Sequence, residues 1–368
     1  MVLAAVVLLL IGACSDGDPL DSRASSAARQ DQLNVPRAVH RATVLDDGRV
    51  LFSGGCTRPG CEGFDRGRAS ELFDPASESF TPGPEMTTAR AGHTATLLED
   101  GRVLLVGGYS GEGQLALTSA EVFDPATNGF VAVGELSVGR ADHSATMLPD
   151  GHVLVAGGTT GRRDALASTE LFDPQSNRFT AGPPLTVPRS GQAAVFTEGQ
   201  LVLIGGTADA DAAVATTDVL QDGSWSPGPP MRQARIKHAA SVLPDQTVLV
   251  IGGATSTEGR DLLASTEILN IPAMRSAPGP DLSEGQYKLE GAVTALQDGR
   301  IVITGGTRID VYDPATGEMS VLTDPPVPRR SFISASTIAA TSVLVAGGYD
   351  SNISPTAAAR IIEVPKAT

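Results

Sequence analysis

Apolar runs that end in two glycines recur about every fifty residues along this chain of 368 residues. Each run, such as RVLLVGG or HVLVAGG, consists of β-branched and aliphatic residues without polar alternation, which is typical of a short strand buried on both faces. A repeat of this length indicates a solenoid or a propeller. The repeat occurs seven times, with diglycines that begin at Gly54, Gly107, Gly157, Gly205, Gly252, Gly305 and Gly347.

Three further strands are predicted around each apolar run. A strand rich in small residues, such as HTATLLED, precedes the run, and Asp-Gly joins the two in the pattern of a two-residue hairpin. After the diglycine, segments such as EVFDP at 121–125 predict a third strand that ends in a type I turn. A fourth strand then opens with an aromatic residue such as Phe130. The repeated unit is therefore four antiparallel strands.

The repeated unit predicts an all-β, seven-bladed propeller over residues 33–368. A single four-stranded sheet leaves both faces uncovered, whereas radial stacking covers them and leaves only short edges. The strand of small residues belongs innermost, where the strands crowd around the axis. Only six fourth strands are found, since the chain ends soon after ARIIEVP. We therefore expect residues near 25–34 to complete the last blade.

The repeat resembles the kelch motif. The resemblance is carried by Arg-x-x-His, by the strand ending in Gly-Gly, by the Glu-Val-Phe-Asp-Pro turn and by the late aromatic residue, and it covers roughly residues 33–364. It implies a bacterial kelch-repeat propeller of the superfamily that includes the central domain of galactose oxidase. Kelch propellers serve as adaptors, actin binders and sugar enzymes, so the resemblance specifies the fold and leaves the function open.

The amino terminus predicts export. Residues 1–13, MVLAAVVLLLIGA, form an apolar run too short to span a bilayer, as in a signal peptide. The sequence that ends at Cys14 resembles a bacterial lipobox, which implies that Cys14 is lipidated and holds the protein on a membrane of the cell envelope. A plain signal peptide with an incidental cysteine is the alternative. The polar, small residues of 14–32 suit a flexible tether.

Charge and cysteine content narrow the possible partners. The chain has 27 basic and 42 acidic residues, for a net charge of −15, so phosphate backbones are repelled and nucleic acid is not expected as a partner. In an exported protein Cys56 and Cys61 are expected to form a local disulfide, because the intervening Pro-Gly can make a turn. A metal pair is the alternative, but it needs further ligands that the vicinity lacks.

A basic residue stands at nearly the same distance before each diglycine. These residues are Arg37, Arg90, Arg140, Arg189, Arg235, Lys288 and Arg330. They form either a cationic ring for an anionic ligand or partners for equally periodic acids on the third strands. We favour the pairing, because a feature of every blade usually serves blade assembly. The acids are Glu71, Glu121, Glu170, Asp218, Glu267 and Asp310.

Residues two positions after the basic ones differ from blade to blade, and we expect ligand contacts among them. Asp142, Lys237 and Glu290 are the candidates; the alternative is that they are ordinary solvated charges. A histidine recurs next to this position, at His40, His93, His143 and His238. We expect structural histidines rather than a metal ring, because neighbouring blades hold them too far apart for one ion. No metal or other cofactor is expected.

The two mouths of the ring are predicted to differ. One carries uniform Asp-Gly and Asp-Pro turns, and the other carries long variable segments, except in the sixth blade, where a short connection leaves a notch. Variable loops on a rigid scaffold usually carry recognition. We therefore predict a monomeric, non-enzymatic, lipid-anchored module that binds a protein or glycan of the cell envelope.

Two alternatives to a binding module stay open. One is an enzyme that processes sugars. The copper chemistry of galactose oxidase-like proteins needs Tyr and His ligands with a Cys-linked Tyr, and it is poorly supported because Cys56 and Cys61 are expected to bond each other. Sialate mutarotases, which are also kelch-like, would be favoured by an open pocket with a cation, Arg140 or Lys237, beside Glu290. The other alternative is an envelope scaffold without a dedicated ligand.

Overall fold

The computed structural model describes residues 32–61, 67–110, 115–161, 164–208, 212–322 and 328–366. The predicted signal segment and Cys14 lie outside the described residues, as does most of the predicted tether. Within the described part of the chain, no helix is long and apolar enough to cross a membrane.

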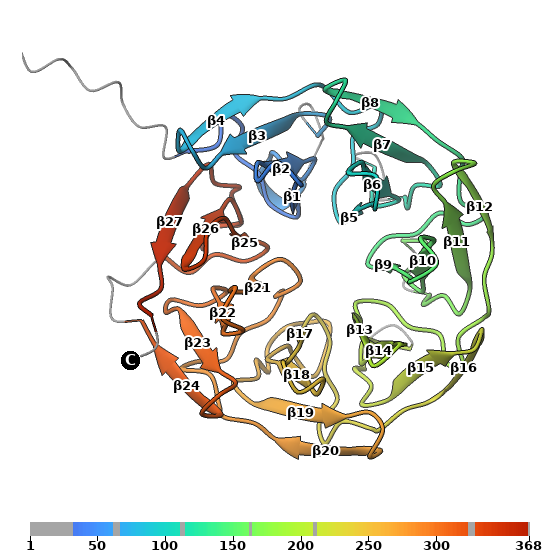
Figure 1. The fold of residues 1–368 in the computed structure, drawn as a ribbon, viewed down its shortest axis with the longest axis vertical. Coiled ribbons are helices and arrows are strands. Elements are labelled where there is room, and N and C mark those ends of the chain that lie inside the picture. The colour runs from blue at the N-terminus through green and yellow to red at the C-terminus, as the bar shows by residue number, and fades with distance from the viewer. Residues whose placement is uncertain are drawn as a thin grey trace, which may run out of the picture.

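Seven antiparallel sheets stand around a central axis, which confirms the predicted seven-bladed propeller (Figure 1). Each sheet follows the chain order, so that each strand pairs with the next one along the sequence. The innermost strands are β1 (Arg41–Val44), β5 (Thr94–Leu97), β9 (Ser144–Met147), β13 (Ala193–Thr197), β17 (Ala239–Val242), β21 (Val293–Ala295) and β25 (Ser334–Thr337).

The second strand of each blade contains the buried apolar run. All four residues of β6 and of β10 are buried, because the blades on either side cover both faces. The second strands are β2 (Val50–Ser53), β6 (Val103–Val106), β10 (Val153–Ala156), β14 (Gln200–Ile204), β18 (Val248–Ile251), β22 (Ile301–Ile303) and β26 (Ser342–Ala346).

The third and fourth strands form the outer part of each blade. The aromatic residues of the two strands meet in register, with ring centroids 5.1 Å apart for Phe123 and Phe130. The third strands are β3 (Ser70–Asp74), β7 (Ala120–Asp124), β11 (Thr169–Asp173), β15 (Thr217–Gln221), β19 (Thr266–Asn270), β23 (Asp310–Asp313) and β27 (Ala359–Glu363). The fourth strands are β4 (Ser79–Pro82), β8 (Gly129–Ala132), β12 (Arg178–Ala181), β16 (Ser224–Pro227), β20 (Arg275–Pro278) and β24 (Glu318–Val321).

The amino-terminal end of the described chain closes the ring. The seventh sheet has three strands of its own, and Gln32 adds to its outer edge through a bridge to Ala358. The Leu33 N–H donates to the Ala357 carbonyl at 2.8 Å, and the Leu33 side chain is buried against residues of the first and seventh blades. The described part of the segment expected near 25–34 therefore supplies the fourth element of the last blade.

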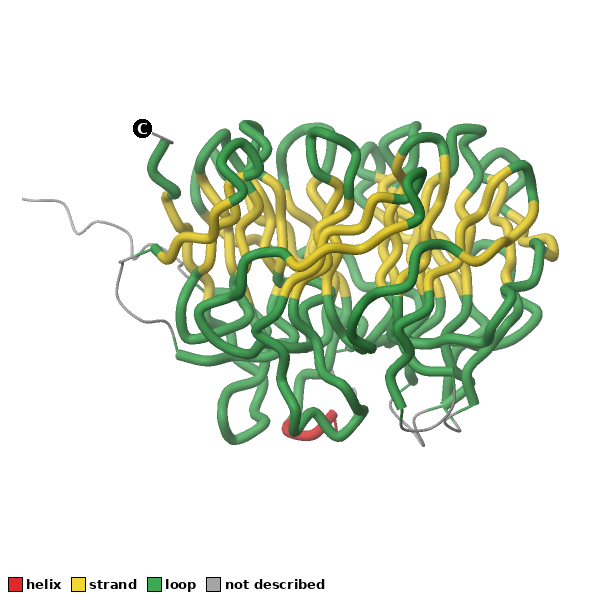
Figure 2. Tube along the Cα trace, turned by 90° about the horizontal axis from the view of Figure 1, so that it is seen from below, coloured by secondary structure: helices red, strands yellow, loops and turns green. Residues whose placement is uncertain are grey.

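The two mouths differ as the pattern of turns predicts. Figure 2 shows short turns on one side of the ring and longer loops on the other, where the 3-10 helix Pro59–Cys61 also lies. The inner strands begin at the long-loop mouth, so the residues just before them surround the entrance to the axis. This entrance is where the repeated basic residues and the candidate ligand contacts lie.

Candidate functional site

In five blades a buried arginine pairs with an acidic side chain on the third strand of the same blade. Each of these arginines is fully buried, and its Nη1 also donates to the carbonyl of the first glycine of the diglycine. The N–O distances are 2.8 Å for Arg37–Glu71, 2.9 Å for Arg90–Glu121, 2.8 Å for Arg140–Glu170, 3.1 Å for Arg189–Asp218 and 2.8 Å for Arg235–Glu267. These side chains stabilise the blades and present no charge to a ligand.

The sixth blade breaks this arrangement, and the predicted pairing of Lys288 with Asp310 is wrong. Gln286 occupies the arginine position, because its carbonyl accepts the Gly253 N–H at 2.7 Å as the arginine carbonyls do in other blades. Its Nε2 donates to Asp310 at 2.9 Å. Burial, without a cation beside the carboxyl, raises the pKa of Asp310. Lys288 lies two residues further on.

In the seventh blade Arg330 keeps its bonds to the backbone. Its Nη1 donates to the carbonyls of Gly347 at 2.8 Å and Ala358 at 3.0 Å. The register of β26 and β27 puts Arg360 opposite Val345, the position that carries the acid in other blades. The last blade therefore differs from the first five in its ionic arrangement.

The residue two positions after the arginine forms a ring at the long-loop mouth, which we call the rim. Its seven members all have positive φ angles, between 51° and 62°. Backbone bonds join neighbouring members, such as Gly191 N–H to the Asp142 carbonyl at 2.8 Å and Lys237 N–H to the Gly191 carbonyl at 3.2 Å. The rim consists of Val39, Gly92, Asp142, Gly191, Lys237, Lys288 and Phe332.

The rim contains Lys288 where the sequence analysis placed Glu290. Asp142 and Lys237 lie on the rim as expected, and the Asp142 carboxylate accepts a hydrogen bond from the Tyr109 hydroxyl at 3.1 Å. Burial and the Asp142 charge raise the pKa of Tyr109, so the phenol stays protonated and remains the donor. Glu290 lies instead in the channel below the rim.

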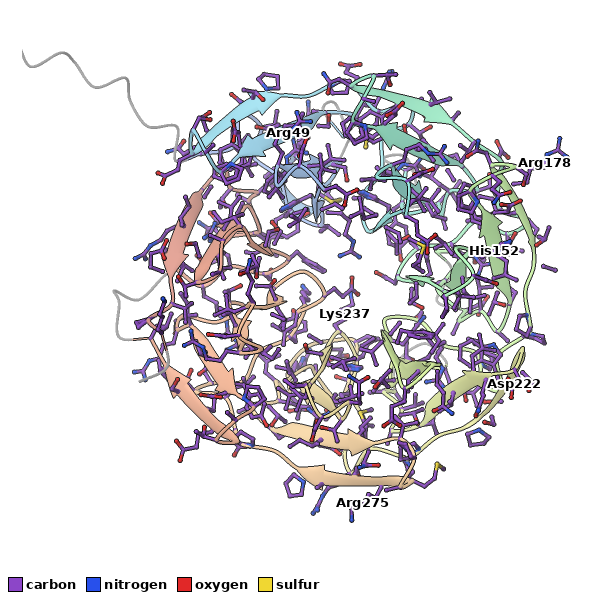
Figure 3. The ribbon with its side chains drawn as sticks, viewed as in Figure 1. Arg49, His152, Arg178, Asp222, Lys237 and Arg275 are labelled. Atoms are coloured by element: carbon purple, nitrogen blue, oxygen red, sulfur yellow. A yellow bond between two sulfur atoms is a disulfide. The ribbon has the colours of Figure 1, made fainter. Side chains whose placement is uncertain are left out.

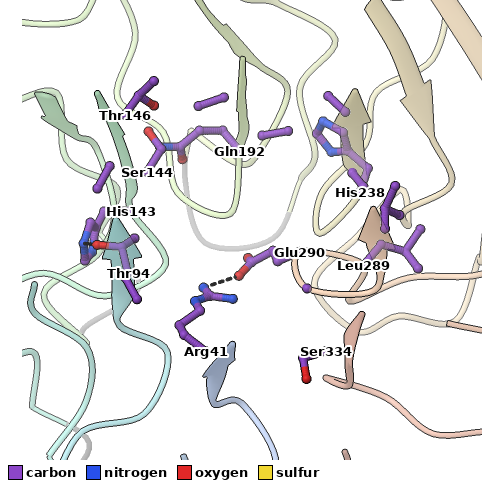
Figure 4. A pocket seen from close by; sticks show the side chains of 18 of the residues that line it. Arg41, Thr94, His143, Ser144, Thr146, Gln192, His238, Leu289, Glu290 and Ser334 are labelled. Atoms are coloured by element: carbon purple, nitrogen blue, oxygen red, sulfur yellow. Dashed lines mark hydrogen bonds and ion pairs between the residues drawn. The ribbon is translucent and has the colours of Figure 1, made fainter. Parts of the chain in front are cut away.

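A cavity of about 370 Å³ occupies the axis at the long-loop mouth. It is lined by the first residues of the inner strands, and therefore by side chains from all seven blades (Figure 4). Alanine methyl groups make up much of its wall. The polar lining includes Arg41, Thr94, Ser144, Gln192, Glu290 and Ser334.

Arg41 and Glu290 form an ion pair inside this channel, with Nη2 and Oε2 2.8 Å apart (Figure 4). The side chains of Arg41 and Glu290 are 20% and 22% exposed, so both side chains can be reached from the channel. Arg41 Nε also donates to the His93 carbonyl at 2.6 Å, which fixes the guanidinium. Burial raises the pKa of Glu290, but the charges of Arg41 and Lys237 more than offset this, and the net shift is downward. Glu290 is therefore ionised at neutral pH.

The sequence analysis missed Arg41, although a signal for it was present. Arg41 opens its inner strand at the register position that small residues, Thr94 and Ser144, occupy in the next two blades. A long cation among small residues at a repeated position could have been recognised as a departure from the repeat. A cation beside Glu290, which would favour a mutarotase, is present, but it is Arg41 at 2.8 Å, while Lys237 affects Glu290 only through its charge. Arg140 is instead held by Glu170.

The repeated histidines connect neighbouring blades. Nε2 lies 2.9 Å from the Ser334 hydroxyl for His40, 3.0 Å from the Ser53 hydroxyl for His93 and 2.9 Å from the Thr94 hydroxyl for His143. Burial and nearby arginines lower the pKa of all four, and that of His238 falls to about 3. In the described part of the chain, no three His, Cys, Asp or Glu side chains gather as a metal site would require.

A disulfide bond joins Cys56 and Cys61 at the long-loop mouth, with the Cα atoms 4.9 Å apart. The loop it closes contacts the seventh blade, because the Gly60 N–H donates to the Ile353 carbonyl at 3.2 Å. The bond therefore shapes one of the variable loops next to the junction where the ring closes.

Comparisons with known proteins agree with the propeller. The family described as the Kelch motif matches residues 140–186. No curated protein matches the chain. Among solved structures, YjhT is similar with a TM-score of 0.59 at 14% identity, over 90% of this chain and 96% of that one. A fungal alcohol oxidase of the AA5 family, in complex with copper, has a TM-score of 0.69 at 17% identity, over 91% of this chain and 76% of the oxidase. At these identities the likeness shows the fold alone.

Proposed function

We propose that this protein is a non-enzymatic binding module that takes its ligand, a protein or a glycan, at the long-loop mouth of the propeller. The observation that carries the proposal is the axial cavity of about 370 Å³, whose entrance and wall hold the charges that do not repeat between blades. A cavity of this size lies in the usual range for ligand pockets. In the first five blades the repeated charges, by contrast, are buried and paired.

The mouth supplies polar groups of both signs. Glu290 and Arg41 face the channel, while Asp142 and Lys237 stand on the rim above it. Figure 3 shows Lys237 beside the centre of the ring, whereas Arg178 and Arg275 lie at its outer edge. A ligand that reaches these groups must approach along the axis from the long-loop side.

Direct binding to a glycan array and to a panel of purified envelope proteins tests the proposal. We expect Glu290→Gln and Asp142→Asn to weaken whatever binding the unchanged protein shows. Arg178→Ala, on the exposed outer strand β12, is the matched control and should bind like the unchanged protein. Equal binding by all four proteins would place the ligand elsewhere and overturn the proposal.

The membrane anchor belongs to the same proposal. Cys14, lipidated after export, would hold the propeller at the envelope through the polar residues that follow it. Expression of the unchanged protein and of Cys14→Ser in a bacterium, followed by fractionation and mass spectrometry of the mature amino terminus, tests it. Recovery of both proteins in the soluble fraction, without lipid on Cys14, would refute the anchor.

The ion pair in the channel favours a second candidate, a mutarotase that acts on sugars. Anomer exchange through the open-chain sugar needs a base that takes the anomeric hydroxyl proton and an acid that protonates the ring oxygen. The ionised Glu290 can act as the base, Arg41 can hold its carboxylate in place, and water can supply the second proton. NMR measurement of anomer exchange over a panel of acidic and neutral sugars, with Glu290→Gln as the inactive variant, separates this activity from binding alone.

Copper oxidation is not part of this proposal. Chemistry of the galactose oxidase kind needs a cysteine linked to a tyrosine, and among the described residues Cys56 and Cys61 are bonded to each other. The repeated histidines His40, His93 and His143 are buried and directed at hydroxyl groups of neighbouring blades.

A further inference from the structure

Lysine is rare in this protein, and its placement is unusual. The chain contains 27 basic residues, of which only Lys237, Lys288 and Lys366 are lysines. Lys237 and Lys288 both stand on the rim, in the fifth and sixth blades. A chain that otherwise uses arginine therefore places two of its three ammonium groups at the entrance to one cavity.

The two ammonium groups converge on one aromatic ring. Lys237 Nζ lies 5.4 Å and Lys288 Nζ 4.7 Å from the ring centroid of Phe332, the rim residue of the seventh blade. Lys288 Nζ also lies 4.7 Å from the ring of Tyr287. Cation–π attraction holds each amine over a ring but leaves its N–H donors unused.

The backbone at these positions strains any side chain. Lys237 and Lys288 have φ angles of 53° and 61°, in the left-handed region, where glycine is at no disadvantage. Gly92 and Gly191 show that the rim accepts glycine at equivalent positions. Side chains that persist in such a conformation cluster at functional sites.

Within the described residues, neither lysine forms a hydrogen bond or an ion pair through Nζ at salt-bridge distance. Glu290, whose pKa responds to Lys237, is held at 2.8 Å by Arg41, and Asp142 accepts from Tyr109. The nearby carboxylates are therefore already engaged, and the two ammonium groups are available to a ligand.

We propose that Lys237 and Lys288 form an anion subsite at the channel mouth that takes the phosphate or sulfate group of a ligand; this inference rests on the proposed binding function and names the chemistry that the mouth recognises. An ammonium group acts as a point charge that suits a tetrahedral oxyanion, whereas planar carboxylates favour the guanidinium fork. The guanidinium in the channel, Arg41, is occupied by Glu290.

The sixth blade gives access to this subsite. Its second and third strands are joined by residues 304–309 alone, whereas residues 252–265 make the same connection in the fifth blade. The sixth blade thus has a shorter loop at this mouth than the fifth. An ester of phosphate or sulfate can therefore place its anionic group between the lysines while the rest of the ligand enters the channel.

The scarcity of lysine makes a direct test possible. The full chain, labelled with 13C at lysine Cε, should give three side-chain signals in an NMR spectrum, and Lys366 serves as an internal control. Sodium phosphate, sulfate and acetate are titrated separately at constant ionic strength. We expect phosphate or sulfate to shift the Lys237 and Lys288 signals with saturation in the millimolar range, acetate to act more weakly, and Lys366 to stay unchanged.

Variants assign the signals and separate binding from packing. Lys237→Met and Lys288→Met should each lower the affinity of the remaining lysine for the anion about tenfold or more, whereas Lys288→Arg keeps part of the affinity and Lys366→Met keeps all of it. If a methionine variant fails to fold, as judged by circular dichroism, the arginine variant still reports on the charge. Absence of saturable shifts, or an equal shift of Lys366, would overturn the subsite.

The result also distinguishes the subsite from the function on which it rests. If ligands still bind at the mouth and depend on Glu290 while the lysine signals ignore phosphate and sulfate, the subsite is wrong and the binding module stands. If the lysine signals respond but no protein or glycan binds, the proposed function is wrong.

Discussion

Replacement of Glu121 by glutamine tests whether the buried ion pairs hold the blades together. Glu121 Oε1 accepts from Arg90 Nε at 2.9 Å, and Oε2 accepts from the Thr87 N–H at 2.6 Å and hydroxyl at 2.9 Å. Thr87 lies on the link from the first blade, so one carboxylate joins two blades. In Glu121→Gln an amide NH2 group, which donates hydrogen bonds, replaces one carboxylate oxygen, and the buried Arg90 loses its counter-charge.

The expected loss of stability is large because neither side chain has access to solvent. The Arg90 and Glu121 side chains are both 0% exposed, so water cannot compensate the lost charge. Breaking a buried pair by removing one partner typically costs about 3–5 kcal/mol. The double variant Arg90→Gln/Glu121→Asp copies Gln286 and Asp310 of the sixth blade, where no arginine is left unpaired, and we expect it to recover part of the loss.

Urea unfolding at pH 7 measures these changes. Trp225, the only tryptophan, reports by fluorescence from the fourth blade, and circular dichroism reports on all strands. Glu318→Gln, at an exposed position on β24, is the matched control and should change the free energy of unfolding by no more than about 0.5 kcal/mol. If Glu121→Gln unfolds within about 1 kcal/mol of this control, the buried pairs do not stabilise the blades as argued.

Three further outcomes follow from the described contacts. Burial lowers the pKa of His238 to about 3, so the stability that the neutral imidazole contributes is present above the unfolded pKa of about 6.5 and is lost as the pH falls toward 3. His238→Gln, which copies Gln192, should reduce the slope of stability against pH over that window, while His40, His93 and His143 keep the remaining slope. Urea unfolding at several pH values measures this, and an unchanged slope would contradict it. Reduction of the disulfide, or the double variant Cys56→Ser/Cys61→Ser, should lower the free energy of unfolding by about 2 kcal/mol. An unchanged midpoint of urea unfolding would contradict this. Leu33→Ala should lower the free energy of unfolding by about 2–5 kcal/mol and speed amide hydrogen exchange first in β26 and β27. If exchange speeds up equally in all blades, this segment does not close the ring.

The blades could be predicted from the sequence because each is built from contiguous residues. The diglycines have positive φ angles in every blade except the sixth, and a Cβ on Gly107 would lie 2.3 Å from the Arg140 carbonyl oxygen. This close approach of one blade to the next requires glycine, so the requirement recurs visibly in the sequence. Strand order and ring closure then follow from the period and from the missing fourth strand.

The side chains of the sixth blade could not be aligned by counting from the diglycine. Lys288 stands at the expected distance from Gly305, yet the backbone bond from Gly253 assigns the arginine position to Gln286. Counting back from the diglycine assumes that the segment between the arginine position and the diglycine has the same length in every blade. In the sixth blade this segment, from Gln286 to Gly305, is longer. The contact between Arg41 and Glu290 spans 249 residues, and it exists only because closure of the ring brings the first blade close to the sixth.

The rim differs between blades, whereas the buried arginine pairs two residues earlier repeat in five of them. Main-chain hydrogen bonds join part of the rim, since N–H groups of one blade donate to the rim carbonyls of Val39, Asp142, Gly191 and Lys237. Residues as different as valine, glycine, aspartate, lysine and phenylalanine stand on the rim at positive φ. The arginines two residues earlier have no such freedom, because buried carbonyls and carboxylates fix them. Some rim side chains have local partners, as Asp142 has in Tyr109 and Phe332 in Tyr349, whereas among the described residues those of Lys237 and Lys288 contact only aromatic rings, which is the difference on which the proposed anion subsite rests.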